Sequence, residues 1–76
     1  MVTKAVILFN TMMNKEEDVK KKLLEIPDVK DVMIVFGVYD LVAKLECDTQ
    51  ERLVDVVSWH IRRLENVLST LTLVGI

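Results

Sequence analysis

The sequence has little of what cofactor and metal chemistry requires. Its 76 residues include a single cysteine, Cys47, and a single histidine, His60. One cysteine cannot form an internal disulfide, and one histidine without a cysteine cluster does not provide a usual set of metal ligands. The sequence therefore predicts no metal and no other cofactor. The cytoplasm is the compartment expected for a chain without disulfides.

Long apolar runs and an excess of basic residues are also missing. No apolar run exceeds five residues, as in residues 5–9, whereas about 20 are needed to span a bilayer. The start of the chain lacks the basic and then apolar pattern of a signal peptide. Ten Lys and Arg against twelve Asp and Glu leave no cationic excess to neutralise phosphates. We therefore expect no membrane and no nucleic acid as a direct partner.

Aliphatic residues are abundant instead. Hydrophobic residues make up 51% of the chain, with thirteen Val, ten Leu and five Ile. A chain of this length forms a single domain, expected to span residues 1–76, and buries only about 60% of the surface of its unfolded state. This content is more than one small monomer readily hides, so the sequence predicts self-association, at least as a homodimer.

Four segments have the pattern of β-strands. The first is apolar on both alternating faces, which is typical of a central strand. In the second, Val32, Ile34 and Phe36 share one face, expected to be the buried one. A short loop containing Gly37 joins the second strand to the third as a hairpin. The four predicted strands are residues 4–10, 29–36, 41–47 and 68–76.

Two helices are predicted between these strands. Asn14 begins the first, with Glu17 at the spacing of a capping box, and Pro27 stops it. Asp48 begins the second, with Glu51 at the same spacing. The second helix has one apolar face, on which the lone histidine is expected to be a packed structural residue. That face consists of Leu53, Val56, Val57, His60, Ile61 and Leu64.

The order β-α-β-β-α-β predicts an α+β fold, the ferredoxin-like sandwich. Both β-α-β units make right-handed crossovers, which places two helices on one face of a four-stranded antiparallel sheet. The first and third strands are expected to be central. An uncovered apolar sheet face is a liability in water, so we expect it to pack against another subunit. That face would carry either residues 5, 7 and 9 or residues 6 and 8, together with Met33, Val35 and Val42.

The segment Gly37-Val-Tyr-Asp40 offers the most chemistry. Glycine adopts backbone conformations that other residues avoid and leaves its amide open to close approach. Asp40 supplies an anionic acceptor suited to an ammonium group, and free amides nearby suit a carboxylate; an amino acid carries both groups. The alternative is a hairpin turn in which Asp40 is only a turn former. Thr70 and Thr72 share one face of the last strand and could add hydroxyls, although threonine is also an ordinary strand residue.

The hairpin over residues 32–48, the helix ending near Leu64 and the strand over residues 67–74 resemble a known module. This module is the effector domain of the leucine-responsive and asparagine-operon regulators, the Lrp/AsnC family, and is called the RAM domain. The most specific shared parts are Gly-x-Tyr-Asp-Leu in the hairpin and Thr-x-Thr in the last strand. Residue 1 lies almost at the first strand, so we expect a stand-alone RAM domain without the family's helix-turn-helix domain.

The resemblance implies a non-enzymatic regulatory module with no catalytic residues. Family members dimerise through their sheets and assemble into rings, often octamers or decamers, with amino-acid effectors bound between dimers. Carried over position by position, Gly37, Tyr39 and Asp40 would form the loop side of the effector pocket. Thr70 and Thr72 would form the strand side. The expected partners are an amino-acid effector, further copies of the chain and full-length Lrp/AsnC paralogues.

Two other functions stay open at this stage. The first is a small dimeric ferredoxin-like enzyme whose pocket lies between the sheet and the helices. Such an enzyme needs convergent acid and base side chains, and the sequence shows only isolated Asp and His residues. The second is a purely structural assembly partner without a ligand.

Overall fold

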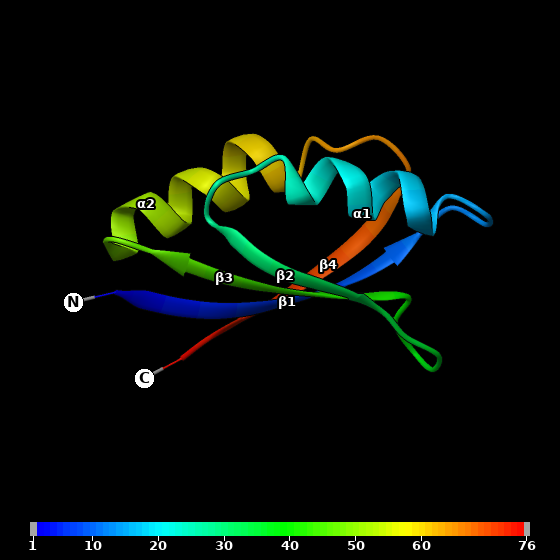
Figure 1. Cartoon of the computed structure of the whole chain (residues 1–76), viewed down its shortest axis with the longest axis horizontal. Helices are drawn as coiled ribbons and strands as arrows, with labels where there is room; N and C mark the ends of the chain where they lie inside the picture. The colour runs from blue at the N-terminus through cyan, green and yellow to red at the C-terminus, as the bar shows by residue number, and fades with distance from the viewer. Residues whose placement is uncertain (1, 76) are drawn as a thin grey trace.

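The computed structural model describes residues 2–75 as one sheet covered by helices. The strands pair in the order β2-β3-β1-β4, and every pair is antiparallel. Both helices lie over the same face of this sheet (Figure 1). The ferredoxin-like prediction is therefore confirmed, with β1 and β3 central. The elements are β1 (Thr3–Thr11), α1 (Glu16–Leu24), β2 (Val29–Ile34), β3 (Leu41–Cys47), α2 (Gln50–Asp55), its π-helical continuation η1 (Val56–Ile61) and β4 (Val67–Val74).

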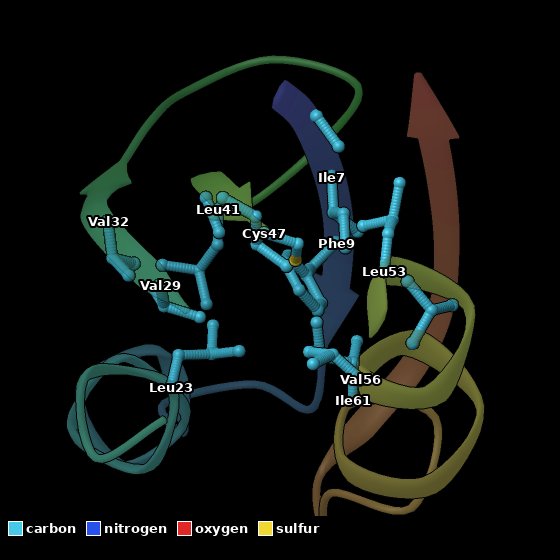
Figure 2. Close-up of a cluster of buried hydrophobic side chains, with 14 of the residues drawn as sticks. Ile7, Phe9, Leu23, Val29, Val32, Leu41, Cys47, Leu53, Val56 and Ile61 are labelled. Atoms are coloured by element: carbon cyan, nitrogen blue, oxygen red, sulfur yellow. The ribbon is translucent and has the colours of Figure 1, made fainter. Parts of the chain in front are cut away.

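The core lies between the sheet and the helices. On β1, Ala5, Ile7 and Phe9 are buried beneath the helical layer, and Ile7 and Phe9 have no exposed surface. Leu23 of α1 and Ile61 of η1 belong to the same buried cluster and point from the helices toward the sheet (Figure 2). The alternation of β1 thus places every second residue in the core, as a central strand requires.

The other face of the sheet is apolar and uncovered. Val6 and Leu8 of β1 are half-buried on this side, and directly paired residues of neighbouring strands share the same side. Leu8 pairs with Val42 and with Leu71. We call this surface the outer sheet face, and it consists of Val6, Leu8, Met33, Val42, Leu71 and Leu73. The predicted uncovered apolar face is confirmed for Met33 and Val42, and residues 6 and 8 are the pair that points away from the helices. Val35, which was also expected on this face, lies beyond the end of β2.

The second strand is shorter than predicted. β2 ends at Ile34, whose side chain is 37% exposed, and Phe36 is fully exposed. The Val35 N–H donates to the Asp40 carbonyl at 2.9 Å, which closes the hairpin before Phe36 can join the sheet. Gly37 then turns the chain with a positive φ of 141°. Ile34 pairs with the buried Leu41 and so lies on the predicted face, at the edge of the sheet, whereas placing Phe36 on that face was wrong. The last strand also differs at its ends, and its predicted residue 76 lies outside the described residues.

Both helix starts differ from the capping prediction. Asn14 is not a cap: it adopts a φ of 65° in a turn, and α1 begins at Glu16 without a side-chain cap. Three acidic residues in the first turn interact favourably with the positive end of the helix instead. Thr49, rather than Asp48, caps α2, and its hydroxyl accepts a hydrogen bond from the Arg52 N–H at 3.0 Å. The capping position is thus shifted by one residue.

The second helix widens into the π-helical segment η1. Its Val57 carbonyl accepts a hydrogen bond from the Arg62 N–H, five residues later, at 3.0 Å. Val56 and Ile61, also five residues apart, are both fully buried. A pattern read with the period of an α-helix therefore misplaces residues in this turn.

His60 is the residue most affected by this widening. It was expected on the apolar face, but it is exposed, as is its neighbour Trp59 with 60% of its surface accessible. The Arg63 guanidinium lies over the Trp59 ring, 4.3 Å from its centre. The prediction of a packed histidine was wrong, because the π-turn rotates residues 59 and 60 away from the core.

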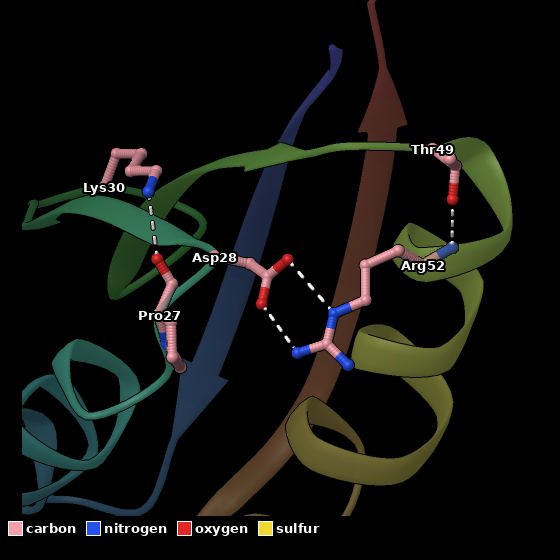
Figure 3. A network of polar contacts seen from close by, with 5 residues as sticks. All are labelled: Pro27, Asp28, Lys30, Thr49 and Arg52. Carbon is pink, nitrogen blue, oxygen red and sulfur yellow. Dashed lines mark hydrogen bonds and ion pairs between the residues drawn. The ribbon is translucent and has the colours of Figure 1, made fainter.

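An ion pair fastens α2 to the turn before β2. The Arg52 guanidinium donates from Nη2 to Asp28 Oδ1 at 2.8 Å and from Nε to Oδ2 at 3.2 Å (Figure 3). These bonds lower the pKa of Asp28 below its usual value. Burial, and then the nearby Asp28 carboxylate, raise the pKa of Cys47 to about 11. Cys47 therefore stays a protonated, buried side chain at neutral pH.

Acid is expected to weaken the contribution of Asp28 to stability. Because its folded-state pKa lies below the unfolded value of 3.8, this contribution is complete above that pH and is lost as pH falls through the folded pKa. Urea unfolding of wild type and Asp28→Asn at pH 7 and pH 3 should show a difference in unfolding free energy that shrinks in acid. Asp31→Asn, on exposed β2 surface, is the control. A difference independent of pH would contradict this role.

Candidate functional site

The predicted loop residues lie together at one end of the sheet. The β2–β3 hairpin projects at the end away from the two chain termini (Figure 1). Gly37 has a positive φ of 141°, and apart from residues 36–38 no heavy atom lies within 4 Å of where a Cβ would stand. The backbone conformation, rather than crowding, thus requires glycine here. Phe36 and Val38 flank it and are exposed, so the loop tip is apolar.

Asp40 anchors this loop to the end of β1. Its carboxylate Oδ2 accepts a hydrogen bond from the Thr11 N–H at 2.9 Å. Its own N–H donates to the Phe9 carbonyl at 2.8 Å. Among residues 2–75, the second carboxylate oxygen, Oδ1, has no hydrogen-bond partner. Asp40 therefore has the structural role of a turn residue and still keeps an acceptor free for another group.

Thr70 and Thr72 lie on a different strand and face the helical layer. They pair with Phe9 and Ile7 of β1, whose side chains are in the core, and both threonines are half-buried at the sheet edge. β1 lies between β4 and the hairpin strand β3. Strands two places apart are separated by about 10 Å. The two sides of the predicted pocket are therefore not adjacent within one chain.

Thr11 is a residue that the sequence analysis missed. It is only 6% exposed, and its hydroxyl has no hydrogen-bond partner in the described structure. Its N–H is the donor that holds Asp40. The alternation of β1 could have placed Thr11 on the buried side, after Phe9. Its hydrogen bond to Asp40 joins residues 29 positions apart, so no local sequence pattern predicts it.

Residues 2–75 contain neither a candidate metal site nor a candidate membrane span. No group of three or more His, Cys, Asp or Glu side chains in this range could hold a metal ion. No helix in the same range is long and apolar enough to cross a membrane.

Comparison with known proteins identifies the class of protein to which this chain belongs. The family model described as "Lrp/AsnC ligand binding domain" matches residues 4–76. The search of curated proteins gave no match. The resemblance seen in the hairpin and the last strand is thus confirmed over almost the whole chain. The fold is that of the ligand-binding regulatory domains of transcription regulators, and this chain belongs to the Lrp/AsnC ligand-binding domain family.

Solved structures agree with this assignment. A hypothetical protein, PHS023 from Pyrococcus horikoshii, is 41% identical with a TM-score of 0.93, over 100% of this chain and 90% of that one. TTHA0845 from Thermus thermophilus is 37% identical with a TM-score of 0.91, over 100% and 94%. The transcriptional regulator NMB0573 from Neisseria meningitidis, solved as a complex with L-Met, shares the fold at 14% identity. Its TM-score is 0.86, over 97% of this chain and 49% of the regulator.

Proposed function

We propose that this chain is an oligomeric, cytoplasmic regulatory module that binds an amino acid and performs no catalysis. The observation that carries the proposal is the hairpin loop, where Gly37 exposes backbone and Asp40 keeps one carboxylate oxygen free. Family membership supports a regulatory ligand-binding role. The L-Met complex of NMB0573 supports an amino acid as the class of ligand.

A complete effector site would need more than one copy of the chain. Asp40 and the Thr70–Thr72 pair lie on opposite sides of β1, so a ligand that contacts both groups would lie between copies. The exposed Phe36 and Val38 offer apolar contact area for such a junction. We propose that the outer sheet face forms a homodimer. Dimers then meet at their hairpins in a larger ring, an octamer or a decamer.

Control of transcription or amino-acid metabolism would then pass through partner proteins. The elements described in residues 2–75 all belong to one α+β sandwich. The balance of charge gives no cationic surplus for DNA. We therefore propose that this domain does not bind DNA itself. It would act through full-length Lrp/AsnC paralogues that carry a DNA-binding domain.

The charge of Asp40 is expected to matter for effector binding. A thermal-shift screen of the twenty amino acids would select the ligand, and calorimetric titration would measure its affinity. Asp40→Asn keeps a side-chain oxygen for the Thr11 N–H but loses the charge. It should therefore weaken binding by about 1.5–3 kcal/mol, the range for a hydrogen bond to a charged group. Thr72→Val removes one hydroxyl and should cost less, about 0.5–1.5 kcal/mol.

Two controls make this test decisive. Asp31→Asn removes an exposed carboxylate on β2 and should leave the affinity unchanged. Circular dichroism of each variant checks that the fold is retained. Equal affinities of wild type and Asp40→Asn would mean that Asp40 is only a turn former. If none of the twenty amino acids binds, the proposed function itself fails.

A further inference from the structure

The last turn of the second helix carries an exposed aromatic and cationic surface. Trp59, His60, Arg62 and Arg63 are all exposed, while Ile61 between them is fully buried. We call the four exposed residues the tryptophan patch. The patch belongs to the helical layer, on the side of the sheet opposite to the outer sheet face (Figure 1). A homodimer formed through the outer sheet face would therefore leave it accessible.

Trp59 is the feature of this patch that the fold does not explain. It is the only tryptophan in the chain, and 60% of its surface is accessible. The Arg63 guanidinium lies 4.3 Å from the centre of its ring, and this contact leaves most of the ring uncovered. A large aromatic ring stabilises a structure mainly when it is buried. Tryptophan and arginine are also the residue types that most often dominate the energy of protein–protein contacts.

The π-helical turn exposes the patch. With an α-helical period, residue 60 would share the buried face of Leu53 and Val57. The Arg62 N–H instead donates to the Val57 carbonyl, five residues earlier, and residues 59 and 60 are exposed. Turns of this kind are rare and are frequently found at functional sites. The backbone irregularity and the exposed tryptophan thus occur at the same position.

The patch is a basic segment of an acidic chain. The net charge of the chain is −2, whereas residues 58–63 include two arginines and no acidic residue. Asp55 and Glu65 lie close in sequence, but neither forms an ion pair with Arg62 or Arg63. The ion pairs among residues 2–75 lie elsewhere, on α1 and between α2 and the turn before β2. Both guanidinium groups are therefore available to carboxylates of a partner.

The surroundings of Arg63 favour a protein over a nucleic acid as this partner. Arg63 also lines a cleft beside α1, together with two lysines and three carboxylates. A nucleic acid carries a phosphate at every step, so these carboxylates would repel it. A peptide can place a few carboxylates opposite the arginines and other side chains elsewhere. The carboxylates of the cleft are Asp18, Glu25 and Glu65.

We propose that the tryptophan patch is a docking surface for a partner protein, which contributes an acidic amphipathic helix. The apolar residues of that helix pack on the Trp59 ring, and its carboxylates accept hydrogen bonds from Arg62 and Arg63. A helix suits this surface, because helices pack side by side with their side-chain ridges interdigitated. The proposal does not depend on binding of an effector at the hairpin.

The single tryptophan makes the occupied patch directly measurable. The probe is a synthetic peptide of about 20 residues, with leucine on one helical face and glutamate on the other. It contains no tryptophan, so a change in tryptophan fluorescence of the whole protein comes from Trp59. We expect a saturable shift of the emission to shorter wavelength, because docking removes the ring from water. Raised salt should weaken binding, since the arginines are exposed.

Substitutions in the patch give the expected fold-changes. Anisotropy of a fluorescein-labelled peptide measures affinity without Trp59. Trp59→Ala should weaken binding about tenfold or more, and so should Arg62→Gln combined with Arg63→Gln, as for hot-spot residues. Lys30→Gln removes an exposed cation of β2 outside the patch and is the control, which should leave the affinity unchanged. Circular dichroism checks that each variant is folded.

Two further probes test the chemistry of the partner. One is the same peptide with lysine in place of glutamate, and the other is a single-stranded oligothymidylate. Binding of the acidic peptide alone, lost in the patch variants, supports the proposal. It is overturned if the acidic peptide gives no saturable shift or if the lysine peptide binds as tightly. Tighter binding of the oligothymidylate, or equal affinities of Trp59→Ala and Lys30→Gln for the acidic peptide, would overturn it as well.

Discussion

Leu8→Lys is expected to make the protein monomeric while leaving its fold intact. Leu8 lies on the central strand of the outer sheet face, between Val42 and Leu71. In a dimer formed through this face, each copy would bring an unpaired ammonium group into an apolar interface, at a cost of several kcal/mol. The core is unaffected, because Leu8 points away from the helices. Light scattering at micromolar concentration should show a dimer or larger for wild type and the monomer mass for the variant.

A control on the helical side tests whether the effect is specific to the face. Leu24 of α1 is also a leucine with much exposed surface, 50% accessible. Leu24→Lys adds the same charge outside the outer sheet face and should keep the wild-type mass. Circular dichroism should be the same for all three proteins. A monomeric wild type, or equal masses for wild type and Leu8→Lys, would contradict assembly through this face.

Phe9→Ala is expected to remove most of the folding stability of the protein at room temperature. Phe9 is among the largest side chains without exposed surface, and it lies at the centre of the core. Truncating a buried phenylalanine to alanine costs about 3–5 kcal/mol, because apolar contacts are lost and a cavity is left. Small domains are typically near the lower end of the range of about 5–15 kcal/mol for folding stability. Little or no net stability should remain.

The hairpin provides the matched control for this prediction. Phe36 is the same residue type but is fully exposed. Phe36→Ala should change the unfolding free energy by no more than about 0.5 kcal/mol, as for other surface substitutions. Urea unfolding of the three proteins at one concentration measures both effects. Similar losses for the two variants would show that burial does not distinguish these rings.

The central position of β1 could be predicted from the burial pattern, and the order of the strands from the β-α-β-β-α-β order of elements with right-handed crossovers. Residues 5–9 are apolar on both sides, and a central strand with one face in the core and one face uncovered has this pattern. Phe36 was misplaced because the prediction used hydrophobicity as a sign of burial in the chain's own core. Its hydrophobicity indicates that the side chain avoids water, but not whether it is covered by its own core or by another subunit. His60 was misplaced because no local feature of the sequence predicts the π-helical turn.

The candidate site was predictable only in its residue types. Glycine and aspartate in the hairpin are visible in the sequence, but the bond from Thr11 to Asp40 joins residues far apart in the chain. The separation of Thr70 from the loop depends on the position of β1 between them. Lys4 and Glu46 likewise become neighbours only through the register of β1 and β3. Contacts of this kind depend on how the strands pair with each other. The periodicity of one strand does not show which residues of another strand it will face.

The two edges of the sheet carry different risks of aggregation. The edge strand β2 contains a bulge and the charged residues Lys30 and Asp31, which discourage pairing with a foreign strand. The edge strand β4, Val67–Val74, has neither a charge nor a proline, and its outer backbone groups are unpaired within the sheet. Such an edge is a template for further strands. Precipitation of this protein on heating is therefore expected to start from β4, unless that edge is covered.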